Sequence, residues 1–176
     1  MTSTPRWLTE PEQRAWRALQ QFGAPLAAAL NRQLLADSAL SSADYHVLVV
    51  LTETDGGVLR AGELGRETGW EKSRLSHHLK RMEARGLVRR DECLTDGRGL
   101  LVRITDAGRQ AIADAAPAHV ATVRDLVIDA LTPEQLRVLA EAGEAVGARL
   151  TTVNCSAAEA ELASSEGENV STSSRG

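Results

Sequence analysis

The chain contains few aromatic residues and few cysteines, and it has no long apolar run. Phe, Trp and Tyr make up 3% of the 176 residues, whereas Ala, Leu and Arg dominate, and this composition favours helix over sheet. The two cysteines, Cys93 and Cys155, are too few for a disulfide scaffold. The apolar stretch Ala43–Leu51 is interrupted by Asp44 and is shorter than the roughly 18–20 residues that span a membrane, so no membrane partner is expected.

The sequence also lacks the motifs of common enzymes and metal sites. It contains no nucleophile elbow, no phosphate-binding loop and no clear carboxylate pair placed for acid–base catalysis. His77 and His78 are adjacent, so on a helix they point about 100° apart and cannot bind one metal ion together. Cys93 has acidic neighbours that oppose formation of a reactive thiolate, and we interpret it as a small strand residue. We therefore expect no catalytic residue, no cofactor and no metal.

The length of the chain predicts one domain with its own core, followed by a tail. Residues 151–176 are mostly Ser, Glu, Ala and Gly with little to bury, which is typical of a disordered segment. The first eight residues carry no charged segment followed by an apolar one, so no export signal is evident. We expect a cytoplasmic, nucleoid-associated protein.

Positive charge is concentrated in one segment, although the whole chain has a net charge of −4. Between Lys72 and Arg90 there are seven Lys or Arg residues and one Asp or Glu, a balance of +6. Affinity for the phosphates of nucleic acid depends on such local density and not on the sum over the chain. This segment is the candidate nucleic-acid surface.

The basic segment lies within a predicted helix, turn and helix. The first helix, Ala61–Thr68, ends at Gly69, a residue suited to a turn with positive φ between two steeply crossed helices. The second helix, Glu71–Arg85, is followed by Gly86, where a helix C-cap usually falls. Its buried stripe is predicted at Leu75, Leu79 and Met82.

A basic hairpin is predicted to follow. Residues 87–93 and 100–104 indicate two short strands joined by a Gly-rich loop, and a third, very short strand is expected at 58–60. Arg98 near the loop tip is placed to enter a DNA minor groove, and Asp96 is placed to orient its guanidinium. The alternative is a local Asp–Arg pair on a solvent-exposed loop. Helix, turn, basic helix and hairpin together are typical of a winged helix-turn-helix that reads duplex DNA.

The polar side of the Glu71–Arg85 helix carries most of the remaining candidate DNA contacts. The residues expected at base edges are Ser73, Arg74, Ser76 and His77. Those expected at the basic face and at phosphates are Lys72, Lys80, Arg81 and Arg89. The alternative is an ordinary solvated basic face with no partner.

The sequence from Glu71 to Val88, followed by Asp96-Gly97-Arg98 and by 101–105, resembles the MarR family of bacterial transcriptional regulators. The resemblance covers roughly residues 6–150, and Leu94 stands where the family often has a proline. It implies a mainly α fold with a small β-hairpin, in which a winged helix-turn-helix is flanked by dimerisation helices. It also implies small phenolic or other aromatic effectors, and it agrees with the wing Asp-x-Arg pattern.

The flanking segments predict apolar helices that one chain cannot bury by itself. One helix is expected from Thr9 to about Ala36, with a kink or local break at Pro25; a largely buried helix at 45–51 follows a capping box at 41–44. Two more are expected after Thr105 and Thr132. Burying roughly 1,000 Å² of their apolar surface per chain, at about 25 cal/mol/Å², would outweigh the cost of association. We therefore predict a two-fold homodimer with an N-terminal dimerisation helix (1–40), a DNA-binding region (41–104) and C-terminal dimerisation helices (105–150).

The resemblance to the MarR family also implies a ligand site between the dimerisation helices and the DNA-binding region. Its candidate residues are Trp16, Arg17, Tyr45 and His46, with Arg17 as a carboxylate partner. The alternative is that the two aromatic residues are packing residues and that His46 is an interfacial histidine. The leading hypothesis is a homodimeric regulator on a pseudo-palindromic operator, a repressor released by a small aromatic ligand. A regulator without a ligand and a winged-helix protein–protein module remain alternatives.

Overall fold

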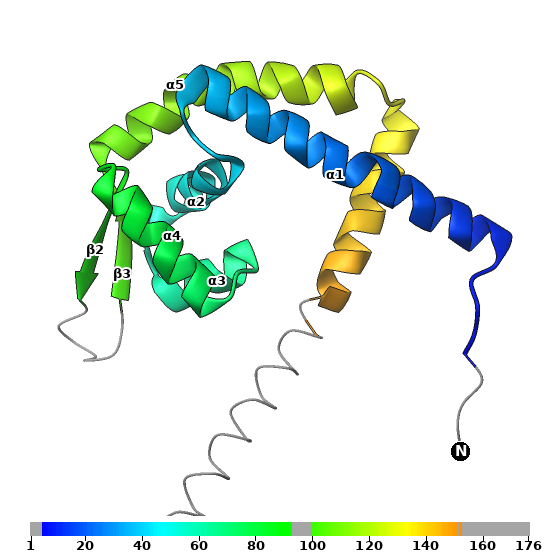
Figure 1. Ribbon diagram of the computed structural model, residues 1–176, viewed down its shortest axis with the longest axis horizontal. Coiled ribbons are helices and arrows are strands. Elements are labelled where there is room, and N and C mark those ends of the chain that lie inside the picture. Colours follow the sequence, from blue (N-terminus) through cyan, green and yellow to red (C-terminus); the bar gives the residue numbers. More distant parts are fainter. Residues whose placement is uncertain (1–4, 93–99, 151, 153–176) are drawn as a thin grey trace, which may run out of the picture. The chain divides into compact units, whose positions relative to one another are not determined.

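The computed structural model describes residues 5–92, 100–150 and 152, and it shows a mainly helical chain with one small antiparallel sheet (Figure 1). The predicted fold class is confirmed. The chain divides into two compact units, Met1–Leu126 and Val127–Gly176. The predicted tail lies outside the described residues apart from Thr152.

The winged helix-turn-helix lies in the first unit. Its elements are α2 (Ser42–Glu53), η1 (Asp55–Gly57), β1 (Val58–Arg60), α3 (Ala61–Thr68), α4 (Lys72–Ala84), β2 (Val88–Glu92) and β3 (Leu100–Ile104). The strand order is β1-β3-β2, and both pairings are antiparallel. Alternation along the central strand places Val102 and Ile104 in the core, while Arg103 between them is exposed. The predicted short strand at 58–60 (β1) and the predicted bounds of the Ala61–Thr68 helix (α3) are confirmed.

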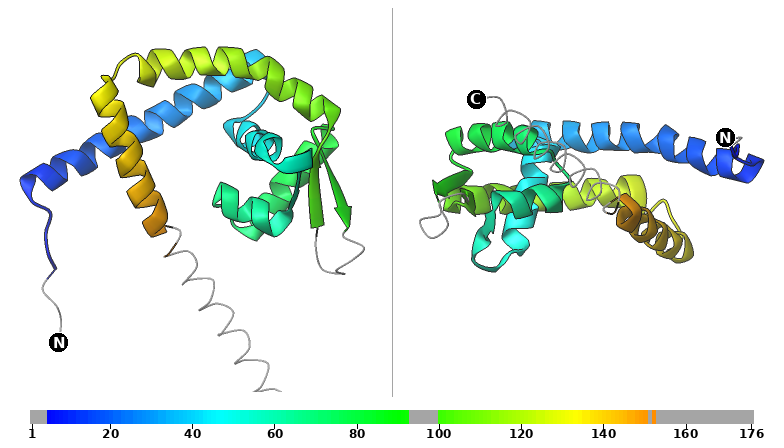
Figure 2. Two further views of the ribbon diagram at one scale, coloured as in Figure 1. Left: turned by 180° about the vertical axis from the view of Figure 1, so that it is seen from behind. Right: turned by 90° about the horizontal axis from the view of Figure 1, so that it is seen from below.

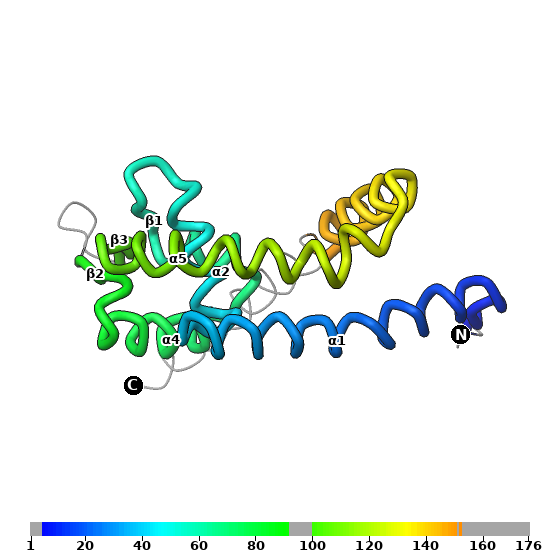
Figure 3. The backbone as a smooth tube through the Cα atoms, turned by 90° about the horizontal axis from the view of Figure 1, so that it is seen from above, coloured from blue at the N-terminus to red at the C-terminus, as the bar shows by residue number. Residues whose placement is uncertain are grey.

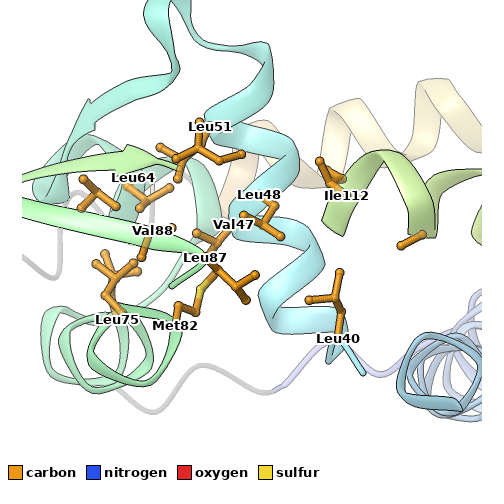
Figure 4. Packing of buried hydrophobic residues seen from close by; sticks show 14 of the residues in the cluster. Leu40, Val47, Leu48, Leu51, Leu64, Leu75, Met82, Leu87, Val88 and Ile112 are labelled. Atoms are coloured by element: carbon orange, nitrogen blue, oxygen red, sulfur yellow. The ribbon is translucent and has the colours of Figure 1, made fainter. Parts of the chain in front are cut away.

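The core of this unit is almost entirely aliphatic. It is built from α2, α3, α4, the sheet, α5 (Asp106–Val123) and Leu34 of the long helix α1 (Glu10–Ser38), with α2 contacting both α3 and α5 (Figure 2). Figure 4 shows how side chains from these elements meet. The residues with no exposed surface are Val47, Leu48, Leu51, Leu64, Leu79, Met82 and Val102. Such packing fixes which side of α4 faces outward.

The long helix α1 (Glu10–Ser38) packs against α5 (Figure 3). It begins with a capping box between Thr9 and Glu12, as the sequence predicted. The predicted local break at Pro25 is wrong, because the helix continues through this residue. Pro25 and Gln21 are both exposed, so the Gln21 carbonyl that loses its helical partner can be hydrated by water.

The start of α5 is packed against the end of α4. The Thr105 hydroxyl donates to the Gly86 carbonyl at 2.6 Å, and the Thr105 amide donates to Leu87 O at 3.2 Å. A Cβ on Gly108 would lie 2.1 Å from Leu87 O, so the two segments can approach this closely only with glycine at 108. The position of α5 relative to the wing is therefore narrowly defined.

Among its described residues the second unit has a helix over 133–150, and η2 (Arg124–Ile128), a π-helical turn, precedes this helix in the chain. Thr132 caps the helix: Gln135 N donates to its hydroxyl, and Thr132 N donates to the Gln135 side chain. Val146 and Leu150 are among its exposed apolar residues. Within the described ranges no single helix has the length and hydropathy to span a membrane; α1 and α2 pass that test only as a pair bent by 81°.

Candidate nucleic-acid interface

The turn between α3 and α4 is closed by two backbone hydrogen bonds. Gly69 has φ 67°, its amide donates to Arg66 O at 3.2 Å, and the Trp70 amide donates to Gly65 O at 3.0 Å. This Schellman pattern requires a left-handed residue at 69, which glycine adopts without strain. The turn therefore sets the direction in which α4 leaves α3, as the sequence predicted.

One side of α4 is buried and the other is exposed. The buried residues are Leu75, His78, Leu79 and Met82. Of the candidate contacts on this helix, Ser76 is half-buried, and the exposed ones are Lys72, Ser73, Arg74, His77, Lys80 and Arg81. The spacing argument thus placed the polar side correctly, and the side chains that it singled out share one surface.

Three exposed cations on α4 have no carboxylate partner among the described residues. Lys72 and Lys80 have no ion pair there. The Arg74 guanidinium carbon lies 4.5 Å from the ring centroid of Trp70, a cation–π contact that leaves the charge of Arg74 without a carboxylate partner. These three side chains keep their charge and their donors for a partner.

Two other predicted phosphate contacts have partners within the protein. Arg81 Nη2 lies 2.9 Å from Nδ1 of His78. Arg89 donates from Nε and Nη2 to the two carboxylate oxygens of Asp91, at 2.7 and 3.1 Å. Arg103, opposite Arg89 in the sheet, lies 3.8 Å from the same carboxylate. The local charge that faces outward is accordingly smaller than the sequence count indicates.

A buried carboxylate holds α4 against the start of α2. Asp44 accepts hydrogen bonds from the amide and hydroxyl of Ser41 at 2.9 and 2.8 Å, and from Arg85 at 2.8 Å. Its other oxygen lies 3.0 Å from Nε2 of His78. Because the guanidinium of Arg81 can only donate, Nδ1 of His78 accepts, so a neutral ring carries its proton on Nε2; this atom lies close to Asp44 but without hydrogen-bond geometry. We call these five residues the Asp44 network.

The comparisons with known proteins agree with this geometry. A family model described as the MarR family matches residues 40–99. The crystal structure of AbsC, a MarR-family transcriptional regulator from Streptomyces coelicolor, is 40% identical, with a TM-score of 0.78 over 83% of this chain and 98% of that chain. The chain belongs to the MarR family.

Two further relatives have the same level of identity. Sco3205, a MarR-family transcriptional regulator from the same organism that was crystallised in complex with DNA, is 40% identical, with a TM-score of 0.78 over 82% of this chain and 91% of that chain. The transcriptional regulator TtmR from Methylorubrum extorquens (strain PA1) is 40% identical over 78 residues, which are 44% of this chain and 39% of TtmR. The alignment therefore spans well under half of TtmR.

The wing contacts predicted for this MarR-family chain cannot be placed. Asp96 and Arg98, together with Cys93 and Leu94, lie outside the described residues. The strands that lead to them, β2 and β3, pair in register from Val88–Ile104 to Glu92–Leu100. Their roles remain predictions.

The four predicted ligand residues do not meet within one MarR-family chain. Asn31 accepts a hydrogen bond from Ser42 N, which places it at the start of α2. Trp16 and Arg17 lie about 15 residues before Asn31 on α1, roughly 22 Å along the helix axis. Tyr45 packs instead against His119 of α5, with ring centroids 4.5 Å apart, and His46 lies 6.3 Å from the Trp70 ring.

The Asp44 network and Trp70 were not found by reading the sequence. The sequence did contain one indication of His78. It lies three residues after Leu75, at the spacing of the buried stripe, so the helical period predicts that it faces the core. Its partner Asp44 was recognised only as a helix cap. A separation of 34 residues hides such a contact from any local pattern.

The buried ionisable groups of this MarR-family domain have shifted pKa values. Burial lowers the pKa of His78, against the attraction of Asp44. Burial also lowers the pKa of His119. For Asp44, burial acts to raise the pKa, but the Ser41 hydrogen bonds and the Arg85 ion pair outweigh it and the pKa lies below its usual value.

These shifts predict that the free energy of unfolding falls as the pH is lowered from 7 to 5. Both histidines have a lower pKa in the folded state, so the unfolded state binds more protons below about pH 6.5, whereas Asp44 stays ionised over this range. Urea titrations at each pH should show a shallower dependence for His78→Gln than for the wild type, and His119→Gln is the control that keeps the His78 contribution. Equal pH slopes for His78→Gln and the wild type would contradict the assignment.

Proposed function

We propose that this protein is a homodimeric, sequence-specific DNA-binding transcriptional repressor. Two copies of α4 enter successive major grooves of a pseudo-palindromic operator, about one helical turn apart. The observation that carries the proposal is the exposed side of α4, where Lys72, Arg74 and Lys80 have no carboxylate partner among the described residues. The DNA complex of the 40% identical Sco3205 supports the choice of partner.

The residues of this surface have different roles in the proposal. Ser73, Arg74, Ser76 and His77 lie in the first two turns of α4 and meet base edges, with Arg74 placed to pair with a guanine. Lys72 and Lys80 meet phosphates, which gives affinity without sequence information. Arg81 and Arg89 also attract phosphates, although each is already bonded within the protein, to His78 and to Asp91. Asp96 and Arg98 act at the minor groove.

The exposed apolar side chains support the dimer. On α1, Trp16, Leu19 and Phe22 lie along one side and are 52%, 50% and 48% exposed. On the 133–150 helix, Val146 and Leu150 are each 57% exposed. Large apolar side chains that recur along two helices and face water are typical of an interface. A second copy of this chain buries them.

The point where α1, α2 and α5 meet supports a ligand response. His119 Nδ1 of α5 lies 3.0 Å from Gln33 Oε1 of α1, and Tyr45 of α2 packs on the same imidazole. A small phenolic or other aromatic anion bound beside Tyr45 would contact α2. The same helix carries Asp44, which holds α4 in place. Such a ligand releases DNA only if it prefers one position of α4 over another. The alternatives are a regulator without a ligand and a winged-helix protein–protein module.

Binding to DNA is predicted to be sequence-selective and strongly dependent on salt. Duplexes selected from a random library provide the probe, and affinity is measured by fluorescence anisotropy at several salt concentrations. Lys80→Ala should weaken all duplexes alike and reduce the salt slope by about 1, whereas Arg74→Ala should relax the preference at one base pair by about 1–3 kcal/mol. Arg14→Ala on the polar side of α1 is the matched control. Selection of no consensus, with no salt dependence, would favour the protein–protein alternative.

The chain is predicted to sediment as a dimer at micromolar concentration. Leu19→Glu should weaken the dimer at least about 100-fold, because it buries a charge without a partner. Gln21→Glu adds the same charge to the opposite, polar side of α1 and should leave the dimer intact. Sedimentation of the wild type as a single chain would overturn the dimer, as would an unchanged Leu19→Glu variant.

Salicylate, a phenolic carboxylate, is predicted to lower the affinity for the selected duplex at concentrations on the order of 1 mM. Tyr45→Ala should weaken this effect, while Glu53→Gln, at an exposed position at the far end of α2, serves as the control. DNA affinity that is unchanged by salicylate and by other small aromatic anions would favour the regulator without a ligand.

A further inference from the structure

Trp70 contacts three side chains of the DNA-binding lobe, although it was not among the candidate site residues. Arg74 lies over its ring at 4.5 Å. The rings of His78 and His46 approach it edge-on, with centroids 5.2 and 6.3 Å away and interplanar angles of 89° and 84°. Trp70 is half-buried and packs against the core cluster.

The position of the indole is fixed from several sides. Its backbone amide closes the α3–α4 turn on Gly65. His78, which meets its ring, is in turn held between Asp44 at 3.0 Å and Arg81 at 2.9 Å. The ring on which Arg74 lies is therefore a rigid platform and not a mobile surface side chain.

A free arginine side chain samples many rotamers, and part of this rotamer entropy is lost when the side chain pairs with a base. A platform that already restricts the guanidinium lowers this cost. The N–H donors that point away from the ring can still pair with the O6 and N7 atoms of guanine. Arg74 beside Trp70 thus keeps donors for hydrogen bonds to a base, while its rotamer entropy is lower than that of a free side chain.

We propose that Trp70 is a positioning residue that orients Arg74 for base readout and thereby sets sequence specificity at the base pair that Arg74 reads. The proposal rests on the proposed function, in which Arg74 meets a base edge. It differs from a purely structural role for Trp70, because a structural role would affect the binding of every duplex alike. The proposal also implies that Trp70 influences base discrimination only when Arg74 is present.

The test is a double-mutant cycle on duplexes selected from a random library with the wild-type protein. Affinity is measured for the consensus duplex, for a set with each base pair replaced in turn, and for a scrambled duplex. The proteins are the wild type, Trp70→Leu, Trp70→Phe, Arg74→Ala and the double variant Trp70→Leu/Arg74→Ala. Trp7→Leu is the matched control, since Trp7 precedes α1 and is 81% exposed.

Trp70→Leu should reduce discrimination at the Arg74 base pair about fivefold, with the other positions and the scrambled duplex unchanged. Trp70→Phe should retain most of the discrimination, because it keeps an aromatic face. In the Arg74→Ala background, the Trp70 substitution should cause no further loss. If Trp70→Leu does not fold, tetrafluorotryptophan at position 70 decides the question, because it keeps the shape and withdraws electron density from the ring face.

Three results would overturn the inference while leaving the proposed function intact. The first is a uniform loss of affinity for all duplexes in the Trp70 variants. The second is full additivity of the Trp70 and Arg74 effects. The third is discrimination by the Trp70 variants equal to that of the wild type. If the wild type selects no sequence from the library, the proposed function fails and this inference fails with it.

Discussion

A buried carboxylate needs compensation from every side, and this requirement determines how α4 is held. Asp44 is 4% exposed, and its oxygens meet Ser41, Arg85 and His78. An unpaired charge at this depth would cost several kcal/mol, so the partners must keep their places together. Because Ser41 precedes α2 and the other two partners lie on or just after α4, the network fixes the rotation of α4 about its own axis. Which side of that helix meets a partner follows from this rotation.

The same small region is connected to the long helices. The carbonyl of Ala39, at the end of α1, accepts a hydrogen bond from Arg85 at 2.7 Å, and Thr105 joins the start of α5 to the turn after α4. Tyr45 follows Asp44 directly and packs on His119 of α5. A displacement of α1 or α5 therefore acts on α4 through a few short contacts. This is the physical route by which a ligand or the dimer partner would change DNA affinity in the proposed function.

The charges of the basic segment divide into two groups. Arg81, Arg85, Arg89 and Arg90 each have a partner within the protein: His78, Asp44, Asp91 and Glu83. Lys72, Arg74 and Lys80 have no carboxylate partner among the described residues. The balance of +6 between 72 and 90 thus combines cations that build the lobe with cations that face outward. Local charge indicates the segment, but only the contacts separate these two uses.

Local signals in the sequence determined the elements and the exposed side of α4. Helical spacing predicted its buried stripe, Gly69 and Gly86 marked its ends, and Ser41 and Asp44 marked the start of α2, because capping, turn chemistry and periodicity act over a few residues. Only the tertiary structure decided that Asp44 is buried against His78 and Arg85, that Trp70 lies under Arg74, and that Trp16 and Tyr45 are far apart in one chain. These contacts join residues by packing between elements, or depend on which rotamer the core permits, and no local pattern carries that information.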